Sequence, residues 1–319
     1  MSIIKAKKIS KSFKKSTLDW KRLCVERKDT VALEDISIDI DEGELVGFLG
    51  PNGAGKTTFL KILSGILYPT SGSVEVLGFN PWDKKYDYLR QIALVMGQKN
   101  QLWWDLPAID SFKLLKEVYS VSGRNFKKNL EMMVDTLGMQ GIVQRRLRNM
   151  SLGERMKCEL TASFLHDPKV IFLDEPTIGL DVFSAQAVRN LLQTINREKK
   201  TTMILTSHYM GDIEELCKRV VMINHGKKMY DGELSALKKQ YAPERKVEVF
   251  LHSVKDREKF AKLPFEKSLE DAKGTIRVEK ERLAVVVEKV FESFEPENIS
   301  ISDIELEEVI TKVFESQTH

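Results

Sequence analysis

The stretch that decides the fold runs Gly50-Pro51-Asn52-Gly53-Ala54-Gly55-Lys56-Thr57 and matches the pattern G-x-x-x-x-G-K-[ST]. It lies between an apolar, strand-like run at 44–49 and a helix-like run at 58–67. Its glycines let backbone N–H groups curve around an anion, and the N-terminus of the next helix adds positive potential. Lys56 supplies a charge for the β- and γ-phosphates, and the Thr57 hydroxyl can bind Mg²⁺. The sequence therefore predicts a site for a nucleoside triphosphate.

Composition predicts a globular chain of about two domains. It has 319 residues, of which 42% are hydrophobic and 30% charged. No apolar run approaches the roughly 18 residues of a membrane span, and the first residues have no apolar core typical of a signal peptide. We therefore expect a cytoplasmic protein that does not itself cross the membrane.

Cysteine usage and charge distribution add two further expectations. The three cysteines, Cys24, Cys158 and Cys217, are far apart and show no metal-ligand spacing, so we expect reduced thiols and no disulfide framework. Residues 1–30 carry ten Lys and Arg against three Asp and Glu, whereas residues 240–319 carry thirteen against eighteen. The two ends of the chain should therefore face different surroundings.

The region before the phosphate loop predicts an antiparallel edge with strands at 3–9 and 31–40. Residues 14–30 are a long basic connection in which Trp20 and Leu23 have a helical spacing, and we expect a solvated loop there. An alternative is a surface that faces a membrane or a partner. Phe13 is either a core or turn aromatic or a platform for an adenine ring.

The middle of the chain predicts an α/β domain interrupted by a helical insertion. Short strands are expected at 72–79 and 92–96, the second of which is followed by Gln98. Residues 105–165 show apolar spacings of three and four residues, which predict helices.

Carboxylates follow a second buried strand. The run 169–173 is almost wholly apolar and ends at Asp174 and Glu175, as in a parallel strand that delivers acids to the ligand edge of a sheet. Two buried carboxylates each need a partner or a proton. A cation and a water would supply these roles, with Asp174 holding Mg²⁺ and Glu175 polarising the attacking water. The alternative is that the strand end is merely solvated. A strand at 201–207 leads to His208, which either contacts a γ-phosphate or caps the next helix.

Together these motifs resemble the ATP-binding subunits of ABC transporters over roughly residues 3–235. Gln98 occupies the Q-loop position, Ser151-Leu152-Gly153-Glu154-Arg155 the signature, Gly179-Leu180-Asp181 the D-loop and His208 the switch histidine. The resemblance implies that Glu175, His208 and Gln98 are catalytic and that Thr57, Gln98 and Asp174 hold Mg²⁺. It also implies contacts to ATP from a larger set: Phe13, Gly50, Pro51, Asn52, Gly53, Ala54, Gly55, Lys56, Thr57, Thr58, Ser151, Gly153 and Asp181.

The signature departs from the family pattern Leu-Ser-Gly-Gly-Gln. Leu152 replaces the first glycine, and Glu154 follows Gly153. A hydroxyl at Ser151 and a backbone N–H at Gly153 are retained, and both can bond a γ-phosphate at a helix N-terminus. Leu152 resembles the Leu-Ser-Leu-Gly variant of exporter subunits for drugs, lipids and polysaccharides.

The resemblance implies a fold and a function. The fold is α/β: a P-loop NTPase core with an antiparallel β subdomain and a helical insertion (domain 1–238). Beyond the resemblance, strand patterns at 246–251, 274–279 and 298–302 and helix patterns at 282–294 and 304–314 predict a small acidic α+β domain (239–319). The ending 301–309 is similar to that of ABC-2-type exporter ATPases of the daunorubicin-resistance branch. The resemblance implies that ATP drives head-to-tail dimerisation, with a second copy or a homologous ATPase as partner, and that ATP hydrolysis lets the two subunits separate.

The expected partners also include integral membrane transporter subunits, with this chain peripheral on the inner face of the cell membrane. No nucleic acid partner is expected. The alternative is a soluble ABC ATPase of iron–sulfur assembly or a nucleic-acid-linked process. Ribosome-acting relatives usually carry two ATPase halves in one chain, and DNA-repair relatives have long heptad arms. Neither feature is present in this sequence, which favours transport.

Overall fold

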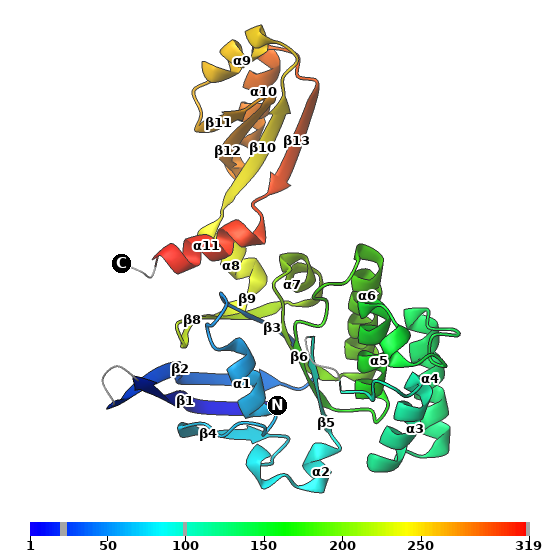
Figure 1. Ribbon diagram of the computed structural model, residues 1–319. Helices are drawn as coiled ribbons and strands as arrows, with labels where there is room; N and C mark the ends of the chain where they lie inside the picture. Colours follow the sequence, from blue (N-terminus) through cyan, green and yellow to red (C-terminus); the bar gives the residue numbers. More distant parts are fainter. Residues whose placement is uncertain (20–23, 98–100, 317–319) are drawn as a thin grey trace. The chain divides into compact units, whose positions relative to one another are not determined.

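The computed structural model describes residues 1–19, 24–97 and 101–316. The chain divides into two compact units, Met1–Gly232 and Glu233–His319 (Figure 1). The boundary lies before the expected one at 238, because helix α8 (Leu234–Tyr241) packs against α11 (Leu306–Ser316) of the second unit. The assignment of the units as an ATP-binding domain and an accessory domain remains a prediction.

The first unit contains a six-stranded sheet in the order β5-β6-β7-β3-β8-β9. Its strands are β3 (Leu45–Leu49), β5 (Ile92–Met96), β6 (Val170–Asp174), β7 (Thr202–Thr206), β8 (Arg219–Asn224) and β9 (Lys227–Glu233). Strands β5, β6, β7, β3 and β8 run parallel. Their apolar runs are buried on both faces, as parallel strands require. The carboxyl ends of β3, β6 and β7 therefore lie at one edge of the sheet.

A second, antiparallel sheet has the order β2-β1-β4, with β1 (Ser2–Asp19), β2 (Cys24–Asp41) and β4 (Ser71–Val76). The expected solvated loop at 14–30 is wrong for most of its length, because the ladder continues from Lys14 paired with Asp29 to Asp19 paired with Cys24. This part of the hairpin has no alternation of apolar and polar residues, so the sequence carries no signal for strands there. Trp20 and Leu23 fall outside the described residues.

Helices surround the six-stranded sheet (Figure 1). Helix α1 (Lys56–Leu63) follows the phosphate loop and ends earlier than the expected 67, because Ser64 and the left-handed Gly65 (φ 77°) close it. The helical insertion contains α3 (Ala108–Val118), α4 (Gly123–Leu137) and α5 (Leu152–Phe164). The remaining helices of this unit are α2 (Tyr86–Leu89), α6 (Val182–Lys199), α7 (Met210–Leu216) and the 3₁₀ turns η1 (Pro81–Asp83) and η2 (Leu147–Asn149).

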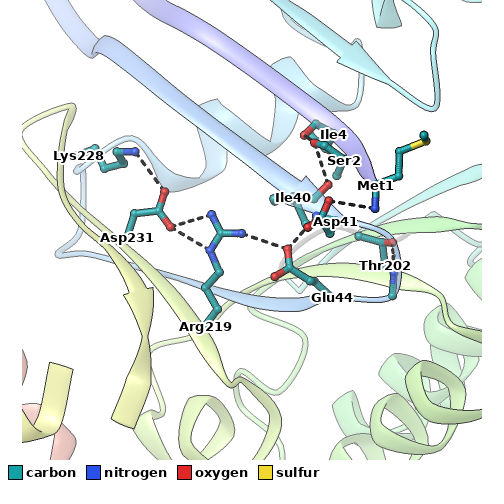
Figure 2. A network of polar contacts seen from close by, with 11 residues as sticks. Met1, Ser2, Ile4, Ile40, Asp41, Glu44, Thr202, Arg219, Lys228 and Asp231 are labelled. Atoms are coloured by element: carbon teal, nitrogen blue, oxygen red, sulfur yellow. Dashed lines mark hydrogen bonds and ion pairs between the residues drawn. The ribbon is translucent and has the colours of Figure 1, made fainter. Parts of the chain in front are cut away.

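A polar network ties the end of the antiparallel sheet to the start of the central one (Figure 2). The Arg219 guanidinium donates to Asp231 at 3.0 Å and to Glu44 at 3.1 Å. Burial would lower the pKa of Arg219, but the hydrogen bonds and charges of these two carboxylates raise it. Glu44 also accepts from the backbone of Asp41 at the end of β2, at 2.8 Å. Glu44, directly before β3, is thus bonded to β2 through Asp41 and to β8 through Arg219. These bonds fix the start of the strand that leads into the phosphate loop.

The second unit is an α+β fold with a sheet in the order β11-β12-β10-β13. Its elements beyond α8 and α11 are β10 (Glu244–Phe250), α9 (Val254–Ala261), β11 (Lys267–Glu270), β12 (Lys273–Glu279), η3 (Lys280–Arg282), α10 (Leu283–Ser293) and β13 (Asn298–Asp303). Val247, Ile276 and Phe260 belong to its own hydrophobic core. The sequence did not predict α9 and β11, since charged residues dominate 254–270; a capping box between Ser253 and Asp256 starts α9.

Candidate functional site

The phosphate loop connects β3 to α1, and two of its glycines are dictated by neighbouring backbone. Gly50 (φ 158°) and Gly55 (φ 110°) adopt conformations that disfavour a side chain. A Cβ at Gly50 would lie 2.3 Å from the Ile223 carbonyl oxygen, and one at Gly55 would lie 2.4 Å from the Ala32 carbonyl oxygen. The loop is therefore packed closely against β2 and β8, while Gly53 has no such neighbour and is exposed.

Lys56 is the cationic group of this loop, and it is only 6% exposed. Its ammonium group donates to the Gly50 carbonyl at 2.7 Å and to the Pro51 carbonyl at 3.1 Å. Burial lowers the pKa of Lys56, and the negative charges of Glu175 and Asp174 act against that shift. The ammonium group is thus held at the phosphate loop, where the two acids face it.

We expect Lys56→Ala to weaken ATP binding roughly tenfold or more, because it removes a charge from a largely desolvated site. Calorimetric titration of the full chain with ATP measures this. Lys61→Ala, on the same helix, is the matched control and should bind ATP normally. Equal affinities for the two variants would contradict a phosphate-binding role for Lys56.

Asp174 ends β6 and is bonded by two hydroxyl groups from separate elements. Thr57 Oγ1 donates to Asp174 Oδ2 at 2.7 Å, and Thr206 Oγ1 donates to Asp174 Oδ1 at 2.7 Å. Asp174 and Thr206 are register partners at the carboxyl ends of β6 and β7. The sheet thus brings the start of α1 and the ends of two strands to one point, as the motif order predicts.

Glu175 and His208 meet next to this point. His208 Nε2 lies 2.7 Å from Glu175 Oε1. Glu175 adopts a left-handed conformation (φ 57°), and its backbone N–H is directed to the Thr206 carbonyl (3.0 Å) and hydroxyl (3.1 Å). A Cβ at Gly97 would lie 2.2 Å from the Glu175 carbonyl oxygen, so a close backbone approach supports this unusual turn. The Glu175 carboxylate therefore ends beside the His208 ring.

The signature segment begins helix α5. The Ser151 hydroxyl accepts from the Glu154 backbone at 3.2 Å, and Glu154 Oε2 accepts from the Ser151 backbone at 2.8 Å. This is a capping box, and it accounts for Glu154 at the place of the family's glutamine. Arg145 donates to the other oxygen of Glu154 at 2.6 Å. The exposed Ser151 thus sits on a fixed helix N-terminus.

Gly153, whose backbone N–H is predicted to bond a γ-phosphate, is a buried residue. A Cβ at Gly153 would lie 3.0 Å from the Ser184 hydroxyl of α6, so its small size also makes room for that helix. Asp181 caps α6 by accepting from the Ser184 backbone at 3.0 Å, and the hydrogen bonds from Ser184 lower its pKa. The signature and the D-loop are therefore packed against each other within one chain.

The remaining predicted site residues lie on β1, in the phosphate loop and on α1, and one falls outside the described residues. Phe13 is 42% exposed on β1, with the Lys11 ammonium 5.2 Å from its ring centroid. Its pairing partner Thr30 lies two residues before Ala32, which contacts Gly55. Pro51 and Asn52 are exposed, Ala54 is buried, and Thr58 lies in the first turn of α1. Gln98 lies outside the described residues.

Three residues near the site, Thr177, Thr206 and Asp212, were not predicted from the sequence. Thr206 bonds both Asp174 and the backbone of Glu175, and the buried Asp212 accepts from the Thr177 hydroxyl. A hydroxyl at the end of a buried strand was the only signal for Thr206. Nothing in the local pattern around Asp212 distinguishes it from the exposed acids of the same helix.

Fold and site together define the class of P-loop nucleotide-binding cassettes. Residues 33–178 match the family described as ABC transporter. The chain is 34% identical over 220 residues to the ABC transporter ATP-binding protein NatA of Bacillus subtilis, which covers 69% of this chain and 89% of that protein. It is 29% identical over 209 residues to the bacitracin transport ATP-binding protein BcrA of Bacillus licheniformis (66% of this chain, 67% of that protein).

Solved structures share the fold. A dimeric ATP-binding cassette in a post-hydrolysis state with ADP and Pi is similar with a TM-score of 0.63 and 24% identity, over 72% of this chain and 98% of that one. The chain belongs to the ABC transporter family as an ATP-binding subunit. Its activity is ATP hydrolysis coupled to transport. Among the described residues, no helix is long and apolar enough to cross a membrane.

Proposed function

We propose that this chain hydrolyses ATP in composite sites between two head-to-tail subunits and so powers export through a separate ABC-2-like membrane partner. The observation that carries the chemical part is the contact of His208 with Glu175, 2.7 Å, beside Asp174 and Lys56. In this assignment Glu175 orients and deprotonates the attacking water, and His208 fixes the Glu175 carboxylate near the γ-phosphate. Gln98 is a further proposed ligand of the reacting water and metal.

The proposed metal is Mg²⁺, and the donor set at the end of β6 fits it. The Thr57 hydroxyl and an Asp174 carboxylate oxygen lie 2.7 Å apart, and both are the hard oxygen donors that Mg²⁺ takes. Mg²⁺ characteristically uses one or two protein oxygens together with phosphate and water, so no larger carboxylate cluster is needed. When bound, the ion would neutralise charge on the β- and γ-phosphates.

The proposed dimer is supported by an exposed signature serine and by the presence of one phosphate loop and one signature in each chain. Ser151, at the N-terminus of α5, is exposed, so a second subunit could reach its hydroxyl. A phosphate loop and a signature occur once each in the sequence, so a head-to-tail pair would form two equivalent ATP sites. The relative with ADP and Pi is itself described as dimeric, which supports the same arrangement here.

The proposed membrane partner would dock at an apolar depression of the first unit. This depression has a volume of about 570 Å³ and lies between the end of α1, α2 and the end of α3. Ile66 and Val118 line it and are 58% and 53% exposed. A cytoplasmic apolar segment of a transporter subunit would cover them and place this chain on the inner face of the membrane. Leu152, which resembles the signature variant of exporter subunits, favours export, and the likeness to a bacitracin transport protein favours coupling to transport.

Purification of the tagged chain from detergent-solubilised membranes tests this proposal. We expect an integral membrane protein to co-purify, and the double variant Ile66→Glu/Val118→Glu to lose it while keeping its ATPase activity. Val254→Glu, which alters a 70% exposed apolar residue of the second unit, is the control. Unimpaired recovery with the double variant would contradict docking at this depression. Absence of any membrane protein would favour the alternative, a soluble ABC ATPase.

A further inference from the structure

Asp212 is a buried carboxylate that the hydrolysis scheme above does not use. It lies on α7 and is 1% exposed. Its Oδ2 accepts from the Thr177 hydroxyl at 2.5 Å and from the Ser207 hydroxyl at 2.7 Å, while its Oδ1 accepts from Arg189 at 2.7 Å. Three donors from three different segments therefore converge on one side chain.

Two of these donors flank the residues assigned to hydrolysis. Thr177 follows Glu175 by two positions, and Ser207 directly precedes His208. The Ser207 hydroxyl also accepts from the Tyr209 backbone at 3.0 Å, so one side chain bridges both neighbours of His208. Because Asp212 bonds both Thr177 and Ser207, it fixes the chain segments that carry Glu175 and His208 relative to each other.

The third donor connects this centre to the D-loop. Arg189 lies on α6, the helix that Asp181 caps. Besides Asp212, its guanidinium bonds Gln186 of α6 at 2.7 Å and lies 2.8 Å from Glu215 of α7. A shift of α6 would therefore be transmitted through Arg189 to Asp212 rather than through apolar packing alone.

A buried carboxylate at this place is costly unless it is fully bonded, and an apolar side chain could fill the same volume without that cost. Charge-assisted hydrogen bonds are directional and short, so they fix the angle and position of the two hydroxyl-bearing segments more tightly than apolar contacts do. We infer that the advantage of a carboxylate over an apolar side chain here is a more precisely fixed position of Glu175 and His208.

We propose that Asp212 is a positioning residue that holds the Glu175 and His208 segments in register and joins them, through Arg189, to the D-loop helix α6. The proposal rests on the proposed roles of Glu175 and His208. It predicts a change in turnover without a matching change in ATP affinity, because none of the groups that Asp212 bonds belongs to the phosphate loop.

We expect Asp212→Asn to lower kcat for ATP hydrolysis roughly ten- to a hundredfold and to leave KM for ATP within about threefold. Asn keeps the volume but removes the negative charge, so the charge-assisted bonds are lost. Its oxygen can still accept from Arg189, but its NH₂ group then faces the two hydroxyls, which would have to rotate and accept. Glu215→Gln is the matched control: it removes a carboxylate that faces the same arginine without touching Thr177 or Ser207. Its kcat should stay within about twofold of the parent chain.

Two further measurements separate positioning from simple stability. In a double-mutant cycle with His208→Ala, the effects of Asp212→Asn should be strongly non-additive, because both changes disable the same contact. Ser207→Ala and Thr177→Val each delete one bond and leave Asp212 in place, and each should lower kcat at an unchanged Tm. These two variants carry the test if Asp212→Asn does not fold.

An Asp212→Asn kcat within twofold of the parent chain, additive effects in the cycle, or unchanged kcat in both hydroxyl variants would each overturn the proposal. Failure of the underlying scheme gives a different result. In that case Glu175→Gln would hydrolyse ATP normally, whatever Asp212→Asn does.

Discussion

Glu175→Gln should reduce ATP turnover roughly a hundredfold or more while ATP binding is retained. Glutamine keeps the size of the side chain and an oxygen that can accept from His208 Nε2, which lies 2.7 Å from Glu175 Oε1. It removes the carboxylate that would take a proton from water. Steady-state phosphate release and a parallel nucleotide titration on the full chain measure the two quantities separately.

Glu198→Gln is the appropriate control, since it neutralises an acid near the exposed end of α6 and should leave turnover unchanged. Near-normal hydrolysis by Glu175→Gln would rule out Glu175 as the general base. Loss of ATP binding together with turnover would instead indicate that the carboxylate is needed to form the site.

Mixing two inactive variants should restore activity if the sites are shared between subunits. Ser151→Arg places bulk and charge at the exposed N-terminus of α5, where a small hydroxyl would meet the γ-phosphate of the opposite subunit. Lys56→Ala disables the phosphate loop of its own subunit. In a mixed head-to-tail dimer one site carries both substitutions and the other carries neither.

At equal concentrations, half of randomly formed dimers are mixed, so we expect about a quarter of the parental activity at most. Each variant alone, at the same total concentration, is the control and should stay inactive. A monomeric ATPase would gain nothing from mixing beyond the sum of the separate activities.

The local motifs of the site could be predicted from sequence because short patterns specify them. The phosphate loop needs left-handed glycines at a fixed spacing, and the structure gives Gly50 and Gly55 those conformations. The apolar run ending at Asp174 and Glu175 is a strand buried on both faces, and such strands deliver side chains to one sheet edge. The meeting of Thr57 with Asp174 follows from that topology.

Other features depend on contacts that no local pattern encodes. The left-handed turn at Glu175 requires the close approach of Gly97, which is distant in sequence. The burial of Gly153 against Ser184 is a packing contact between two helices. The outer part of the β1–β2 hairpin, from Lys14 paired with Asp29 to Asp19 paired with Cys24, lacks apolar alternation, and its ladder of backbone hydrogen bonds does not depend on such a pattern. Asp212 became recognisable only when its partners converged in space.

The most direct test of the central claim is the mass of Glu175→Gln in solution with and without ATP and Mg²⁺, measured by light scattering. Two composite sites that trap ATP predict a monomer without nucleotide and a dimer of twice that mass with ATP and Mg²⁺, which Ser151→Arg added to the same chain should abolish. A chain that binds ATP with full occupancy and stays monomeric would contradict the account.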